Sequence, residues 1–151
     1  MAADTCVTAR LINGGQSCIA AKRFIIVEKI YDEFEKLFVE KMKSKKMGDP
    51  FDESNYIGPQ ASVPLRDELH QQVTKSIELG AKLLLGGNIP EMEGAWYPPT
   101  VLSNVKKGMP AYDEELFGPV AALIKVKDEE EAIQLPTIQF LDLVLLFLLE
   151  I

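Results

Sequence analysis

The chain of 151 residues is long enough for one domain with a buried core. Apolar residues make up 47% of it and charged residues 26%, which is the composition of an ordinary globular protein. The formal net charge of -7 argues against non-specific nucleic-acid binding, because such binding needs a basic surface.

The first half of the chain alternates helical and extended patterns. Residues 1–11 read as the end of a helix, which the glycine pair after Asn13 interrupts. The β-branched run at 23–27 (RFIIV) predicts a short buried strand. Apolar side chains then recur at helical spacing and predict an amphipathic helix over 30–45. Turn residues predict a loop over 47–59.

The second half continues the alternation. A helix is predicted to begin after Ser62, which can cap it, and to end at Gly80. Shorter elements are predicted after it: strands over 82–85, 100–105 and 120–126, a short helix or turn over 112–116, and a helix over 128–135. We therefore predict an α/β fold with an open, twisted, mostly parallel sheet and flanking helices.

Nothing in the sequence indicates secretion or membrane insertion. Two cysteines, Cys6 and Cys18, do not make a disulfide framework. The first ten residues (MAADTCVTAR) lack the basic and apolar regions of a signal peptide. The apolar run near the C-terminus is too short for a transmembrane helix, which needs roughly 20 residues. We expect a cytoplasmic protein with reduced thiols.

The segment from Asn13 to Cys18 (NGGQSC) is a glycine turn that ends in a thiol. Such a turn lets backbone amides approach a reacting atom, and the Cys18 amide could help to hold an oxyanion. An ionised thiol is an effective nucleophile. The same pattern also fits a small buried cysteine beside a strand, so the pattern alone leaves both interpretations open. Cys6 has no such turn and is predicted to be structural.

Two longer segments resemble the aldehyde dehydrogenase superfamily. Residues 13–23 (NGGQSCIAAKR), followed by FIIVE, resemble its active-site segment, and residues 115–120 (ELFGPV) resemble its Glu-x-Phe-Gly-Pro motif. Four shorter strings lie between them where the family has them: Met47–Pro50, Ile57–Pro59, Gly80-Ala81 and Gly86-Gly87. Residues 65–72 and 83–87 are most similar to bacterial succinate-semialdehyde dehydrogenases.

The resemblance implies a partial aldehyde dehydrogenase catalytic domain over residues 1–135. In the family, the residue matching Cys18 attacks a small aldehyde, hydride passes to NAD or NADP, and water hydrolyses the thioester to the acid. Glu115 would hold the nicotinamide ribose and Phe117 would line the nicotinamide site. Without the family, Glu115 reads as a solvated carboxylate and Phe117 as core. The resemblance implies no metal site, and a homo-oligomer for the intact enzyme.

Several parts that the family needs cannot be found in this sequence. They are the dinucleotide-binding domain, the general-base glutamate and an asparagine of the oxyanion hole. We therefore expect a fragment that is inactive, or nearly so, on its own. Two other interpretations stay open. One is a non-enzymatic remnant or assembly module that pairs with an intact paralogue through exposed sheet edges. The other is a thiol redox sensor that uses Cys18.

Residues 136–151 (PTIQFLDLVLLFLLEI) form an atypical apolar tail that departs from the family. Pro136 would interrupt the helix that precedes it. One permitted codon choice for residues 135–151, read from the last base of its first codon, encodes Ala-Asn-Asp-Thr-Ile-Phe-Gly-Leu-Gly. This string is the continuation expected of the family. Loss of one base near Leu135 would therefore explain the tail as a reading-frame slip.

Overall fold

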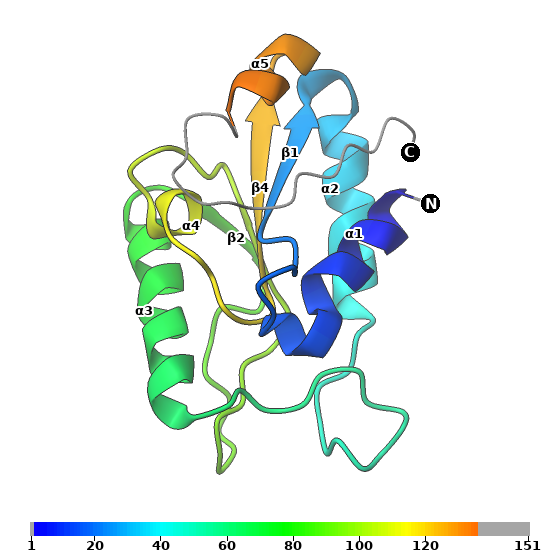
Figure 1. Cartoon of the computed structure of the whole chain (residues 1–151), viewed down its shortest axis with the longest axis vertical. Helices are drawn as coiled ribbons and strands as arrows, with labels where there is room; N and C mark the ends of the chain where they lie inside the picture. Colours follow the sequence, from blue (N-terminus) through cyan, green and yellow to red (C-terminus); the bar gives the residue numbers. More distant parts are fainter. Residues whose placement is uncertain (1, 136–151) are drawn as a thin grey trace.

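Helices and strands alternate along residues 2–135, the part of the chain that the computed structural model describes (Figure 1). The elements in chain order are α1 (Ala2–Leu11), the 3-10 helix η1 (Ile12–Gly15), β1 (Arg23–Val27), α2 (Glu28–Lys43), α3 (Val63–Glu78), β2 (Lys82–Leu85), β3 (Thr100–Ser103), α4 (Pro110–Asp113), β4 (Val120–Val126) and α5 (Glu129–Gln134). The predicted apolar tail, residues 136–151, lies outside the described residues.

The four strands form one sheet in the order β1-β4-β3-β2. β4 pairs in parallel with β1 and with β3, whereas β2 and β3 are antiparallel. The predicted open, mostly parallel α/β sheet is thus confirmed. Arg23 at the start of β1 lies opposite Ala122 of β4. Because parallel strands begin at the same edge, the segments that precede β1 and β4 meet there.

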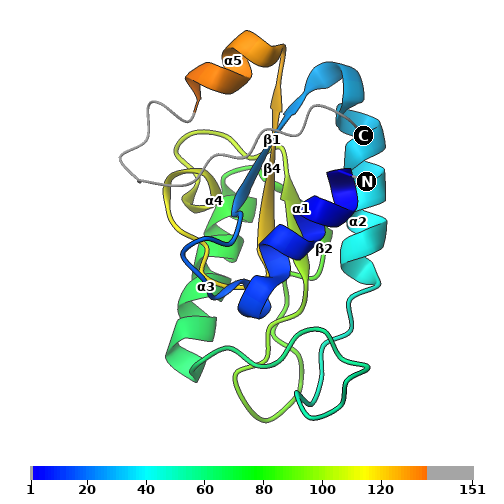
Figure 2. The same ribbon diagram turned by 45° about the vertical axis from the view of Figure 1, so that its right-hand side comes forward.

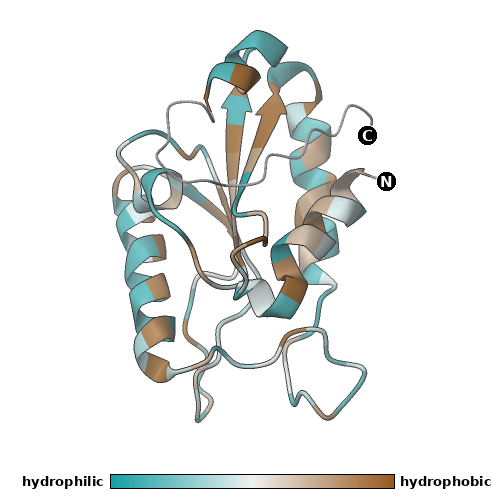
Figure 3. Cartoon of the chain, in the orientation of Figure 1, coloured by the Kyte–Doolittle hydropathy of each residue, from teal (hydrophilic) through white to brown (hydrophobic). Residues whose placement is uncertain are grey.

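Helices cover both faces of the sheet. Figure 2 shows α1 and α2 on one side of the strands and α3 on the other. The first face buries aromatic side chains of α2, among them Phe34 and Phe38, against Phe24 of β1. The second buries Leu69 and Val73 of α3 against β4. The apolar strands therefore lie between the helix layers, as the hydropathy colouring in Figure 3 shows.

Local signals explain most of the element bounds. β1 and β4 coincide with the predicted strands. The hydroxyl of Ser62 accepts a hydrogen bond from the Leu65 amide at 3.4 Å, so the predicted cap of α3 is confirmed. β3 ends at Ser103, two residues early, because Asn104 has a left-handed φ of 53° that a strand cannot continue.

Two predicted helices are present, but their predicted bounds were wrong. α2 begins two residues before the predicted start and ends at Lys43, not at residue 45. α4 occupies Pro110–Asp113 instead of residues 112–116. Pro110 fits the first turn of a helix, where its missing N–H costs nothing, and this position sets the start of α4. No helix within residues 2–135 is long and apolar enough to cross a membrane.

Candidate functional site

The turn that carries Cys18 leaves α1 through a run of left-handed residues. Asn13, Gly14 and Gly15 have φ values of 50°, 62° and 78°. The Asn13 side chain donates to the carbonyl of Gln16 at 3.0 Å, which offsets part of the strain of a non-glycine residue there. The turn then presents Cys18 as an exposed side chain at the sheet edge. The interpretation of Cys18 as a small buried residue is therefore wrong.

The Gln16 side chain hydrogen-bonds this turn to the loop that precedes α3. Its Oε1 accepts a hydrogen bond from the Ala61 amide at 2.7 Å, and its Nε2 donates to the Pro59 carbonyl at 3.4 Å. A side-chain amide that bonds at both ends holds two loops at a fixed distance. The residue before Ser17 and Cys18 is thus hydrogen-bonded to main-chain groups 43 and 45 positions further along the sequence.

Arg10 lies under the turn and is fully buried. Its Nη2 donates to the Gly15 carbonyl at 2.7 Å. Its Nε and Nη1 find no hydrogen-bond partner among residues 2–135. Burial lowers the pKa of this guanidinium to about 10, and the negative charge of Glu115 opposes that shift. Arg10 therefore remains a cation at neutral pH and interacts electrostatically with Glu115 of the second motif, residues 115–120.

Lys22 joins the two motifs directly. Its Nζ donates to the carbonyls of Ser17 at 2.9 Å and Cys18 at 3.0 Å. The same atom lies 2.8 Å from Oε1 of Glu115. The Lys22 side chain is only 2% exposed, whereas that of Glu115 is 40% exposed. A buried ammonium thus holds the thiol turn and an accessible carboxylate together at the sheet edge.

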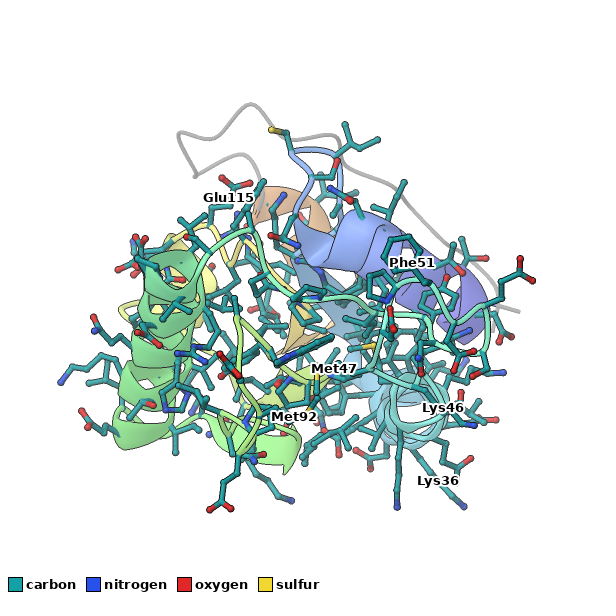
Figure 4. All side chains as sticks on the ribbon, turned by 90° about the horizontal axis from the view of Figure 1, so that it is seen from below. Lys36, Lys46, Met47, Phe51, Met92 and Glu115 are labelled. Carbon is teal, nitrogen blue, oxygen red and sulfur yellow. The ribbon has the colours of Figure 1, made fainter. Side chains whose placement is uncertain are left out.

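Glu115 and Phe117 line a pocket of about 340 Å³ between the second motif and α3. Its remaining wall residues are Leu65, Glu68, Leu69 and Gln72. Gln72 donates from Nε2 to the Glu115 carbonyl at 3.3 Å, which fixes the segment against α3. Phe117 is 37% exposed, so its interpretation as ordinary core is wrong. Figure 4 shows Glu115 on the side of the molecule opposite Lys36.

The sequence therefore identified the candidate site residues but not the buried cations that lie between them. It singled out Cys18, Glu115 and Phe117, and the fold brings their segments to one edge of the sheet. It did not single out Lys22 or Arg10, since a cation in a helix or before a strand reads as surface until its burial is known. No group of His, Cys, Asp and Glu side chains within residues 2–135 could hold a metal ion.

Comparison with known proteins identifies the class of protein to which this site belongs. The model of the aldehyde dehydrogenase family matches residues 1–136, so the chain belongs to the aldehyde dehydrogenase family. It is 52% identical over 135 residues to the NAD(P)+ succinate semialdehyde dehydrogenase Sad of Escherichia coli K12, covering 89% of this chain and 29% of that protein. It is 48% identical over 134 residues to the NADP(+) succinate-semialdehyde dehydrogenase of Mycobacterium avium, covering 89% and 28%.

Solved structures agree with the sequence relatives. The succinic semialdehyde dehydrogenase of Streptococcus pyogenes, in complex with NADP+ as the cofactor, superposes with a TM-score of 0.85 at 35% identity. The match covers 89% of this chain and 30% of that one. The chain thus spans less than a third of the length of these relatives, and its fold matches that of a part of the Streptococcus pyogenes enzyme.

Proposed function

We propose that this chain is the catalytic-cysteine segment of an NAD(P)-dependent aldehyde dehydrogenase. Cys18 is the nucleophile, and Glu115 and Phe117 face the nicotinamide end of the cofactor. The observation that carries the proposal is the exposed Cys18 thiol on a left-handed glycine turn, linked through Lys22 to the Glu115 carboxylate. The family match over residues 1–136 supports it.

Cys18 supplies the covalent chemistry. Its sulfur attacks the aldehyde carbon, and the carbonyl oxygen takes a proton to give a thiohemiacetal. Loss of hydride from that carbon, with loss of the hydroxyl proton, leaves a thioester on Cys18. Water adds to the thioester, and the carboxylic acid departs as the thiol is restored. The Cys18 amide helps to hold the oxyanion that develops in the first and last steps.

The residues at the second motif fit a nicotinamide cofactor. NAD or NADP would supply the hydride acceptor when bound. Lys22 occupies only Oε1 of Glu115, and the carboxylate is 40% exposed, so the other oxygen can accept hydrogen bonds from ribose hydroxyls. The partly exposed ring of Phe117 offers an apolar face to a flat heterocycle. These two side chains would therefore orient the nicotinamide end towards the turn of Cys18.

Succinate semialdehyde is the proposed substrate, because relatives 52% and 48% identical to this chain carry that activity in their names. Grafting tests the proposal. A chimera in which residues 1–135 replace the matching segment of the Escherichia coli relative should oxidise succinate semialdehyde. Cys18→Ser in that chimera should lower kcat by at least about 1,000-fold, since the nucleophile is lost. A folded chimera that oxidises no aldehyde would contradict the proposed function.

We also propose that the isolated chain of 151 residues has no dehydrogenase activity on its own. It contains no recognisable glycine-rich phosphate loop. The oxyanion-hole asparagine of the family cannot be found in it either, and loss of one such donor alone costs about 100-fold or more in rate. The purified chain should therefore produce no reduced cofactor from succinate semialdehyde with NAD or NADP. The Cys18→Ser variant gives the background rate. A steady increase in reduced cofactor that this variant abolishes would show that the isolated chain is active.

A further inference from the structure

Lys22 makes three polar contacts, which use all three N–H donors of its ammonium group. An ammonium group has three N–H donors. The acceptors of Lys22 are the Ser17 carbonyl at 2.9 Å, the Cys18 carbonyl at 3.0 Å and Oε1 of Glu115 at 2.8 Å. A buried ammonium is costly unless it is paired and hydrogen-bonded, and this one is both. No donor is left over for a substrate or a cofactor, so Lys22 acts through its neighbours.

The next residue, Arg23, binds main-chain carbonyls of the segment that leads to Glu115. Nη1 of Arg23 donates to the carbonyls of Tyr112 at 2.7 Å and Glu114 at 3.2 Å. Lys22 directly precedes β1 and Arg23 is its first residue, so two adjacent side chains hold the same segment. Arg23 thus sets the backbone position of the second motif, and Lys22 sets the direction of the Glu115 carboxylate.

We infer that Lys22 is a positioning residue that clamps the Cys18 turn to the Glu115 carboxylate, so that the nucleophile and the ribose-binding group keep one relative position. The inference rests on the proposed function for the roles of Cys18 and Glu115. The contacts that carry it do not depend on those roles. Lys22 binds the main-chain carbonyl of Cys18, so we expect a change in either charge of the pair to alter the reactivity of the thiol of the same residue.

Other charged groups near the pair belong to neighbouring elements. They are Arg10 of α1, Arg23 of β1, Glu68 of α3, and Glu114 beside Glu115. All of them stay in place when the pair is changed. Lys22 and Glu115 together are neutral, so removing the lysine makes the surroundings of the Cys18 turn one charge more negative. Removing the carboxylate charge makes them one charge more positive. An anion disfavours a thiolate and a cation favours it.

The test is the pH profile of Cys18 alkylation by iodoacetamide in the full chain. In Lys22→Met, the midpoint of the profile should rise by about half a pH unit or more. In Glu115→Gln, it should fall by a similar amount, and in the double variant it should return close to the wild-type value. Lys36→Met and Glu33→Gln are matched controls on an exposed part of α2 and should leave the midpoint unchanged. A role in folding alone does not shift the midpoint in opposite directions.

Cys6 provides the folding control in the same measurement, because it is buried in the core and reacts readily at neutral pH only when the core opens. If Lys22→Met exposes Cys6, the Glu115→Gln variant alone tests the clamp. This substitution keeps the size of a partly exposed side chain, so it should leave the fold intact. Midpoints that move in the same direction, or a Glu115→Gln midpoint equal to that of the wild type, would overturn the clamp. The measurement contains no aldehyde and no cofactor, so a failed clamp is distinct from failed aldehyde oxidation in the chimera.

Discussion

The main chains of Gly15 and Gly118 pack directly against each other, although the two residues belong to different motifs. A Cβ atom built on Gly15 would lie 2.1 Å from the Gly118 carbonyl oxygen and 2.9 Å from Nη2 of Arg10. Non-bonded carbon and oxygen atoms cannot approach to 2.1 Å. The thiol turn and the segment of Glu115 therefore meet at a point where only glycine fits, and this contact sets how close the two motifs lie.

Gly15→Ala should destabilise the chain because it adds an atom at this contact and places a side chain at a φ of +78°. We expect a loss of about 2 kcal/mol or more in the free energy of unfolding, measured by urea denaturation. Gly108→Ala is the matched control. Gly108 has a φ of +92°, but a Cβ there meets nothing within 4 Å, so its cost should be about 1 kcal/mol. Equal losses in the two variants would contradict the close contact.

The same contact shows what the sequence could and could not predict. Local patterns located β1 and β4, because a run such as RFIIV favours a buried strand wherever it occurs. The cap at Ser62 was predictable for the same reason, since its partner is three residues away. The meeting of Gly15 with Gly118 depends on strand order, and no local pattern contains that information.

Lys22 illustrates the limit at the site. Its partners Ser17 and Cys18 are five and four residues away, but the third, Glu115, is on a segment that only the parallel pairing of β1 with β4 brings near. From the sequence alone, Lys22, which lies just before β1, would be interpreted as one of many solvated lysines. The resemblance to the family pointed to Cys18, Glu115 and Phe117. The link between the first two became visible only in the fold.

Cys18 should react with an alkylating agent much faster than Cys6. Cys18 is exposed, whereas Cys6 is 8% exposed and burial raises the pKa of its thiol to about 11. At pH 7, roughly one Cys6 thiol in 10,000 would be ionised, and the thiolate is the reactive form. Mass mapping after brief treatment with iodoacetamide should show a preference for Cys18 of about 100-fold or more. Cys6 labelling should increase as the pH approaches 11. Preferential labelling of Cys6 at pH 7 would contradict both assignments.

Ser76→Ala should destabilise the packing of α4, the helix that ends two residues before Glu115. The buried Oγ of Ser76 accepts a hydrogen bond from the Ala111 amide at 2.9 Å and donates to the Gln72 carbonyl at 2.8 Å. Its removal leaves a buried amide without a partner, which costs about 1–3 kcal/mol in the free energy of unfolding. The control is Ser44→Ala, where the lost hydrogen bond to the Lys41 carbonyl is exposed. That change should stay within about 0.5 kcal/mol by urea denaturation. A larger effect at Ser44 than at Ser76 would be inconsistent with the buried bond.

Deleting residues 136–151 should improve the solubility of the chain, or at least not reduce it. Of these 16 residues, 11 are Ile, Leu, Val or Phe, and only Asp142 and Glu150 are charged. No single buried face can accommodate a run that is apolar on all sides, and such runs promote aggregation. Leu145→Glu combined with Leu148→Glu keeps the length of the tail and should have the same effect, measured by size-exclusion chromatography at rising concentration.

Genomic sequence tests the origin of the same tail. If one base was lost near Leu135, the DNA one frame away should encode a continuation similar to the family, beginning Ala-Asn-Asp-Thr. An unrelated sequence in that frame would end the frameshift hypothesis. The deletion variant gives an independent outcome. If it unfolds, with Cys6 becoming reactive at pH 7, then residues 136–151 contribute to the structure and were selected for it. If instead Cys6 stays protected, the core of residues 2–135 is stable without the tail, because its two apolar layers are closed by α1, α2 and α3.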